Sequence, residues 1–288
     1  MLLLTGATGN VGRELSRELD ASDVTFRVLV RDLGRAATLP ARAERVVGDL
    51  ADPATLRPAF EGVTRLFLLV PGIGLDHTSN ALAAAVAAGV RHIVLLSSFN
   101  VLGDPIPAMG RWHHEREKMI RASGIPATML RPGGYMTNAV EWLATIREDG
   151  FVLDPTGPGR YAPIDPADIG AVAARVLTED GHEHAEYVLT GDEVFTVAEQ
   201  VAVLAKAIGR DIEVREVATP AEVIRSRYPG GAPPALAAAL LDALTRARAD
   251  TIGLRTNTVE HLLRRRPTTF ESWCIRNAST FRHHELMA

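Results

Sequence analysis

The first half of the chain alternates short apolar runs with segments of helical periodicity. The apolar runs have strand length and fall at residues 2–4, 28–30, 45–47, 66–70, 92–96 and 127–130. Helical patterns fall between them at residues 11–19, 53–60, 79–88 and 112–122. Strands without polar alternation are typical of a parallel sheet that is covered on both faces. The pattern therefore predicts an α/β fold with a Rossmann-type doubly wound parallel sheet.

The pattern of apolar runs and helical segments changes after about Phe151, where Gly, Pro and Asp separate shorter segments. Helical patterns return at 167–177, 197–208 and 235–247, with a Pro/Gly-rich loop at 228–234. A capping sequence formed by Thr268, Thr269, Phe270 and Glu271 predicts a last helix through Trp273. We expect residues 1–150 to form a nucleotide-binding domain, with part of its sheet open to completion from the second half. Residues 151–288 would form a smaller α+β lobe over the carboxyl edge of the sheet, for the substrate.

A glycine-rich turn follows the first strand directly and precedes the first helix. The glycines allow a tight turn, a close approach of backbone to a pyrophosphate, and close packing of helix on strand. The helix start then presents N–H groups and a partial positive charge to phosphate oxygens. A turn without a ligand is the alternative, but position and context both favour dinucleotide binding. The residues predicted to bind are Gly6, Thr8, Gly9, Asn10, Val11 and Gly12.

The spacing Gly-x-x-Gly-x-x-Gly resembles the TGATGxxG signature of the atypical and extended short-chain dehydrogenases/reductases. The NmrA-like group is the more similar part of that family, and it includes NADPH quinone reductases and triphenylmethane-dye reductases. The resemblance covers nearly the whole chain. It continues through Arg31, Gly48-Asp49-Leu50, Ser97-Ser98, Ser123-Gly124, Leu130-Arg131-Pro132-Gly133, residues 165–169 and residues 267–273.

The cofactor preference depends on the residue after the second strand, which is Arg31. An acidic residue there would bind the ribose hydroxyls of NAD, whereas an arginine accommodates the 2′-phosphate of NADP. We therefore expect NADP(H) in preference to NAD(H). Asp32 follows at once and would favour NAD if it turned inward, and Arg35 could reinforce a phosphate site. A surface ion pair is the alternative role for Arg31.

The family resemblance also implies cofactor contacts further along the chain. Asp49 and Leu50 would flank the adenine, and Val70 and Pro71 would line the path to the nicotinamide ribose. Each of these has a structural alternative, since Asp49 could cap a turn and the Val70-Pro71 pair could simply end a strand. The remaining cofactor positions are Ser97, His113, Pro132 and Gly133, and the substrate positions are Ser98, Tyr135 and Asn138.

The chain departs from typical short-chain dehydrogenases in its proton donor. Those enzymes use a tyrosine with a lysine four residues later, and none of the four tyrosines here has that partner. Counting back from Ser123-Gly124 places the two positions near Met109 and His113. His113, on a charged helix with Glu117 one turn later, and Tyr135, after the glycine pair, are the catalytic candidates. Packing or a solvated helix face is the alternative for both.

An intact nucleotide turn without the usual acid indicates a substrate that accepts hydride readily. We expect an NADPH-dependent oxidoreductase that reduces a quinone-like or polycyclic aromatic substrate, because such acceptors need little acid catalysis. Family analogy extends this to aromatic natural-product tailoring with a partner oxygenase. The alternative is an NmrA-type protein that senses NADP(H) without catalysis and regulates a partner.

Composition restricts the remaining classes. The formal net charge of −4 comes from well-mixed charges, so we expect no nucleic-acid partner. A single cysteine, Cys274, excludes an intramolecular disulfide, and no His/Cys/Glu grouping has metal-ligand spacing. No signal-peptide pattern or bilayer-length apolar run occurs, so a cytoplasmic protein without a membrane partner is expected. The helical surfaces would allow a homodimer.

Overall fold

The chain forms two compact units that alternate along the sequence. The computed structural model describes residues 1–217, 219, 221–222, 224, 228, 230–250 and 252–282. The first unit contains Met1–Ile106, Gly110–Pro132 and Pro166–Leu189, and the second contains Pro107–Met109, Gly133–Asp165 and Thr190–Ala288. This division differs from a single boundary at residue 150, because residues 166–189 return to complete the first unit.

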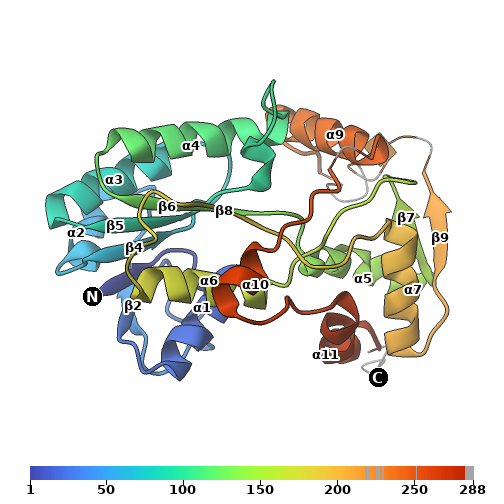
Figure 1. Cartoon of the computed structure of the whole chain (residues 1–288), viewed down its shortest axis with the longest axis horizontal. Coiled ribbons are helices and arrows are strands. Elements are labelled where there is room, and N and C mark those ends of the chain that lie inside the picture. The colour runs from blue at the N-terminus through green and yellow to red at the C-terminus, as the bar shows by residue number, and fades with distance from the viewer. Residues whose placement is uncertain are drawn as a thin grey trace. The chain divides into compact units, whose positions relative to one another are not determined.

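The first unit is built on a seven-stranded sheet in which every pairing is parallel (Figure 1). The strand order is β3-β2-β1-β4-β5-β6-β8, which is the doubly wound order with one further strand. The predicted fold class is therefore confirmed, although β8 was not predicted. The strands are β1 (Leu2–Leu4), β2 (Phe26–Val30), β3 (Glu44–Val47), β4 (Arg65–Leu68), β5 (His92–Leu96), β6 (Ala127–Pro132) and β8 (Glu186–Leu189).

Helices cover both faces of this sheet (Figure 1). Helix α1 (Asn10–Ala21) packs against α6 (Pro166–Thr178) on one face. The other face carries α2 (Leu56–Phe60), which follows the short helix η1 (Pro53–Thr55), then α3 (Asp76–Ala88) and α4 (Arg111–Ala122). Strand and helix side chains interlock there in one buried core that includes Leu3, Leu66, Ile93, Phe60 and Leu82. This core explains why the strands carry apolar residues at nearly every position.

The strand order reverses between β1 and β4, and this places a crevice at their carboxyl ends. The Thr5 side chain ties the two strand ends together. Its hydroxyl donates to the Leu69 carbonyl at 2.8 Å and accepts from the Leu69 N–H at 2.8 Å. Gly6 and Pro71, which follow the two strands, are thereby held on either side of the crevice.

The second unit contains helices and two strands from the 151–288 region, whereas the helical pattern at 167–177 is α6 of the first unit. A core of aromatic rings centres on Trp273, whose ring stacks on Phe270 with centroids 5.7 Å apart. Its two strands pair in parallel in the order β7-β9. The elements are η4 (Met136–Trp142), α5 (Leu143–Glu148), β7 (Phe151–Asp154), α7 (Val197–Ile208), β9 (Glu213–Glu216), α9 (Pro234–Arg248), α10 (Thr258–Leu263) and α11 (Phe270–Arg282).

Helix α11 begins where it was predicted, continues through Trp273 and extends to Arg282. Thr269 and Glu271 of the predicted capping sequence both form side-chain contacts. The Thr269 hydroxyl accepts from the Ser272 N–H at 3.1 Å, while Glu271 forms an ion pair with Lys206. Of the predicted 228–234 loop, Pro229 lies outside the described residues. Over the described ranges, no helix combines the length and apolar character needed to span a bilayer.

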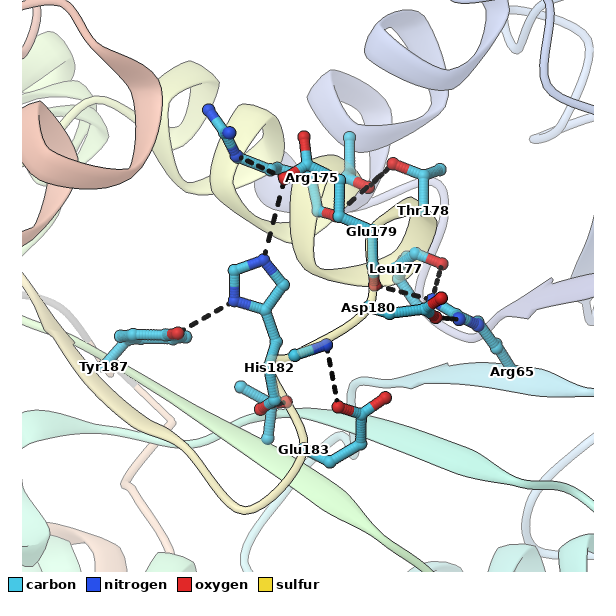
Figure 2. Close-up of polar contacts among 12 residues, drawn as sticks. Arg65, Arg175, Leu177, Thr178, Glu179, Asp180, His182, Glu183 and Tyr187 are labelled. Atoms are coloured by element: carbon cyan, nitrogen blue, oxygen red, sulfur yellow. Dashed lines mark hydrogen bonds and ion pairs between the residues drawn. The ribbon is translucent and has the colours of Figure 1, made fainter.

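The returning segment 166–189 is fastened to the sheet at the amino ends of the strands (Figure 2). Arg65, at the start of β4, donates to the carbonyls of Leu177 and Glu179, each at 2.9 Å. It also pairs with the carboxylate of Asp180. These carbonyls end α6 and lack helical partners, so a guanidinium is a suitable cap.

A buried histidine lies beside this fastening. The Thr128 hydroxyl donates to the His182 carbonyl at 2.6 Å, so its oxygen accepts from the Nε2–H of His92 at 2.9 Å. This fixes the tautomer and leaves Nδ1 of His92 buried, with no hydrogen-bond partner among the described residues. Burial lowers the pKa of His92 below 6.5, because an Nδ1 proton there would have no acceptor.

We predict that His92 makes the protein less stable in mild acid. The unfolded chain binds a proton near pH 6.5 and the folded chain does so only at lower pH, so the free energy of unfolding falls as the pH drops through 6.5. Denaturant unfolding between pH 7.5 and pH 5 should show this decrease in the free energy of unfolding, and His92→Gln should make the decrease smaller. The exposed His261→Gln is the matched control and should keep the wild-type decrease. An unchanged decrease in His92→Gln would refute the assignment.

Candidate functional site

A cleft of about 220 Å³ lies at the carboxyl ends of β1, β2, β3 and β4. It brings together six of the residues predicted to bind the cofactor: Gly6, Thr8, Arg31, Asp49, Leu50 and Pro71. The cleft is also lined by residues that the sequence did not assign to it. These are Thr5, Leu29, Val30, Asp32, Arg35, Gly48, Ala51, Leu69 and His77.

The glycine turn brings the start of α1 against the end of β1. Gly6 has a φ of +66°, a conformation that side chains rarely adopt, and the Gly9 N–H donates to its carbonyl at 3.0 Å. A Cβ atom at Gly12 would lie 2.2 Å from the Gly6 carbonyl oxygen, so only glycine fits there. All residues of α1 are described, and no side chain caps its start and no acidic residue occupies its first turn. The helix end therefore suits an anion.

The rim of the cleft after β2 carries two arginines and one aspartate. One Asp32 oxygen accepts from the Gly34 N–H at 2.8 Å, so this carboxylate shapes the local turn. Arg31 and Arg35 are exposed, and neither forms an ion pair or hydrogen bond with any residue that the structure describes. Two guanidinium groups without a protein partner at one rim of the cleft are suited to binding a phosphate dianion.

The turn after β3 forms another wall of the cleft. The Asp49 carboxylate accepts from the Ala51 N–H at 2.9 Å, while the Asp49 N–H donates to the Thr55 hydroxyl at 2.9 Å. The Leu50 side chain is buried in the core. The alternative role of Asp49 as a turn cap is therefore present in the structure, and it coexists with a position on the cleft wall.

Helix α4 carries a buried carboxylate that organises the ends of β5 and β6. Ser97 donates to Glu117 at 2.7 Å, and Arg131 donates to both Glu117 oxygens at 2.9 and 2.6 Å. Burial alone would raise the pKa of Glu117, but the hydrogen bonds from Arg131 and Ser97 outweigh it and lower the pKa. The hydroxyl of Ser97 is thus already engaged. Ser98 accepts from the Asn100 N–H at 3.2 Å at the start of η2 (Phe99–Val101).

His113 lies on the first turns of α4, at the position where the family resemblance expects a lysine. Burial and the charge of Arg116 lower the pKa of His113 to about 4, against an opposing effect of Glu117. Its Nδ1 atom is buried without a hydrogen-bond partner among the described residues. At pH 7 only roughly one molecule in a thousand carries an imidazolium at such a site. A neutral His113 can position a ligand but is a poor source of an acidic proton.

Three predicted residues, Gly133, Tyr135 and Asn138, belong to the second unit, whereas Pro132 ends β6 in the first. The backbone of Tyr135 bridges to Ile164. Burial raises the pKa of the Tyr135 phenol to about 12, so the phenol stays protonated at neutral pH. Asn138 is exposed. In the described part of the chain, no group of three His, Cys, Asp or Glu could hold a metal ion.

Comparisons with known proteins agree with this nucleotide-binding geometry. A family model described as NAD(P)H-binding matches residues 6–180. The NAD(P)H azoreductase of Xenophilus azovorans is 34% identical over 98% of this chain and 99% of its own length. The (4-alkanoyl-5-oxo-2,5-dihydrofuran-3-yl)methyl phosphate reductase of Streptomyces griseus is 36% identical over 98% and 99%.

A solved structure agrees as well. The NADPH-dependent quinone oxidoreductase QOR2 of Escherichia coli, complexed with NADPH, is 30% identical and superposes with a TM-score of 0.82, covering 96% of this chain and 99% of that chain. The chain belongs to the NAD(P)H-binding family. The resemblance to NADPH quinone reductases predicted from the sequence is confirmed.

We predict that Glu117 is required for stability, in contrast to its neighbour Glu115. Glu117→Gln leaves the buried Arg131 without its bidentate partner and should lower the free energy of unfolding by about 3 kcal/mol. Glu115→Gln removes only an exposed pair with Lys118 and should cost less than about 1 kcal/mol. Denaturant unfolding at pH 7 measures both, and equal losses would contradict the buried network.

Proposed function

We propose that this protein transfers a hydride from NADPH to a quinone-like or polycyclic aromatic acceptor. The chain is an NAD(P)H-dependent oxidoreductase, as its family membership and its full-length reductase relatives establish. The preference for NADPH and the class of acceptor are the proposal. The names of two relatives support the proposal, because one is an NAD(P)H azoreductase and the other is an NADPH-dependent quinone oxidoreductase.

The cleft of the first unit fits NADPH. The start of α1 would take the pyrophosphate, and Asp49 and Leu50 would border the adenine. The 2′-phosphate would lie at the rim where Arg31 and Arg35 have no other partner. Asp32, which would favour NAD, is bonded to the Gly34 N–H instead. The further cofactor contacts proposed are with Val70, Pro71, Ser97, His113, Pro132 and Gly133.

The observation that carries the acceptor class is His113, whose pKa is lowered to about 4, at the position where the resemblance to typical short-chain dehydrogenases implies a lysine. Bound NADPH supplies the hydride, and a quinone takes up that hydride and one proton to become a hydroquinone. Neither neutral His113 nor the Tyr135 phenol, with a pKa of about 12, is a strong acid at neutral pH. The substrate must therefore accept the hydride without protonation by an acidic side chain, and water can supply the proton.

The substrate contacts proposed are Ser98, Tyr135 and Asn138, with positioning by neutral His113. Transfer of the hydroquinone to an oxygenation step, and a homodimer, stay predictions. A non-catalytic NADP(H) sensor is not favoured, because the two relatives that are 34% and 36% identical over nearly their whole length are named as reductases.

The first test mixes the purified protein with NADPH and a panel of quinones and azo dyes. We expect loss of nicotinamide absorbance with several quinones and little activity toward simple ketones, which need an acid. NADPH binding without turnover on any acceptor would contradict the proposal and favour the sensor.

The second test addresses the cofactor. In Arg31→Ala/Arg35→Ala, we expect kcat/KM for NADPH to fall by about 10- to 100-fold, because charged hydrogen bonds to the 2′-phosphate are lost. The value for NADH should hardly change. The matched control Arg57→Ala, on α2 and away from the cleft, should leave both unchanged. Equal losses with NADPH and NADH in the double variant would refute the phosphate site.

A further inference from the structure

Helix α4 places a second buried charge, Arg116, next to Glu117. Arg116 is only 2% exposed, and burial lowers the pKa of its guanidinium. Unlike Arg131, it has no carboxylate partner among the described residues, and its Nε atom is buried without an acceptor. Burying a cation in this way is costly, so the contacts that it does make must compensate.

Those contacts all go to one loop. The guanidinium donates to the carbonyls of Val70 at 3.4 Å, Gly72 at 2.6 Å and Gly74 at 3.0 Å. This loop joins β4 to α3, and its member Pro71 lines the nucleotide cleft. One guanidinium thus contacts both ends of residues 70–74, the part of the loop that includes Pro71.

The loop has few other anchors. The backbone of residues 71–74, all of which are described, makes no hydrogen bond with other backbone groups. Pro71, Gly72 and Gly74 are exposed, so apolar packing holds little of the loop in place. Gly72 has a φ of +68°, which lies in the left-handed region. A residue with a side chain would be strained there and would favour a different loop conformation. Arg116 is therefore the main restraint on the loop shape.

We propose that Arg116 is a positioning residue for the nucleotide site, because it fixes the β4–α3 loop as a preformed wall for the cofactor. This inference rests on the proposed NADPH site and assigns Arg116 no contact with the reacting atoms. A preformed wall lowers the entropy cost of ordering the loop when the cofactor binds, so the effect should appear in cofactor affinity.

The test compares Arg116→Met, Arg116→Lys and the matched control Arg121→Met by NADPH titration and steady-state kinetics. Arg121 is on the same helix but pairs with Glu117 and Glu186, away from the loop. We expect Arg116→Met to raise the Kd for NADPH by about tenfold or more, with a smaller change in the KM for quinone. Arg116→Lys, with one ammonium in place of the fork, should recover part of the affinity. Arg121→Met should lose stability but keep the wild-type Kd.

A double-mutant cycle with Gly72→Ala separates loop positioning from general destabilisation. No atom lies within 4 Å of a Cβ at Gly72, so this change strains only the backbone conformation. In the wild-type background, Gly72→Ala should weaken NADPH binding several-fold. In the Arg116→Met background it should change the Kd for NADPH little, because the loop is already unrestrained. Should Arg116→Met not fold, Arg116→Lys replaces it in the cycle.

Each outcome bears on one claim. Additive effects, or wild-type affinity in a folded Arg116 variant, would overturn the positioning role. Failure of the wild-type protein to bind NADPH would instead overturn the proposed function, because every comparison starts from that affinity.

Discussion

Helix α1 starts so close to the end of β1 that a Cβ at Gly12 would lie 2.2 Å from the Gly6 carbonyl oxygen. This approach directs the uncapped start of the helix at the carboxyl edge of the sheet, where the strand order reverses. The cleft therefore opens at the point where parallel α/β sheets place their ligands. The hydroxyl of Thr5 extends the constraint to the next strand, since it holds β1 against Leu69.

Two adjacent charged residues on α4 stabilise different parts of the first unit. Glu117 binds Ser97 and Arg131 at the ends of β5 and β6, and Arg116 binds the carbonyls of the β4–α3 loop. The same helix carries His113, whose neutral ring results from burial and from the Arg116 charge. The resemblance to typical short-chain dehydrogenases implies a tyrosine and a lysine on this helix, but here its buried charges hold the neighbouring strand ends and loop in place.

Strands β1 to β6 were predictable because they contain apolar runs, and all of them except β3 are mostly buried. Strands β8 and β9 were not predicted. The apolar run of β8 after Glu186 is short and partly exposed, and β9 has a single apolar residue, Val214. The positions of the glycine turn and Arg31 at the cleft were predictable because each directly follows a strand in the sequence. Asp32 offered a local signal that was missed, as an aspartate two residues before a glycine commonly caps its own turn.

The buried pair on α4 could not be predicted in the same way. In sequence, Arg116 and Glu117 belong to a charged helix face, and their partners lie many residues away at Gly72 and Arg131. Only the packing of α4 against the sheet and its loops makes these charges buried. The division into two units has a similar origin, because the contacts of Arg65 with the end of α6 join distant segments.

A crystal structure with bound NADP⁺ tests the central claim most directly. We expect the pyrophosphate at the start of α1 and the 2′-phosphate in contact with Arg31 and Arg35, with Asp32 still bonded to the Gly34 N–H. A ribose whose 2′-oxygen faced the Asp32 carboxylate, with both arginines turned to solvent, would contradict it.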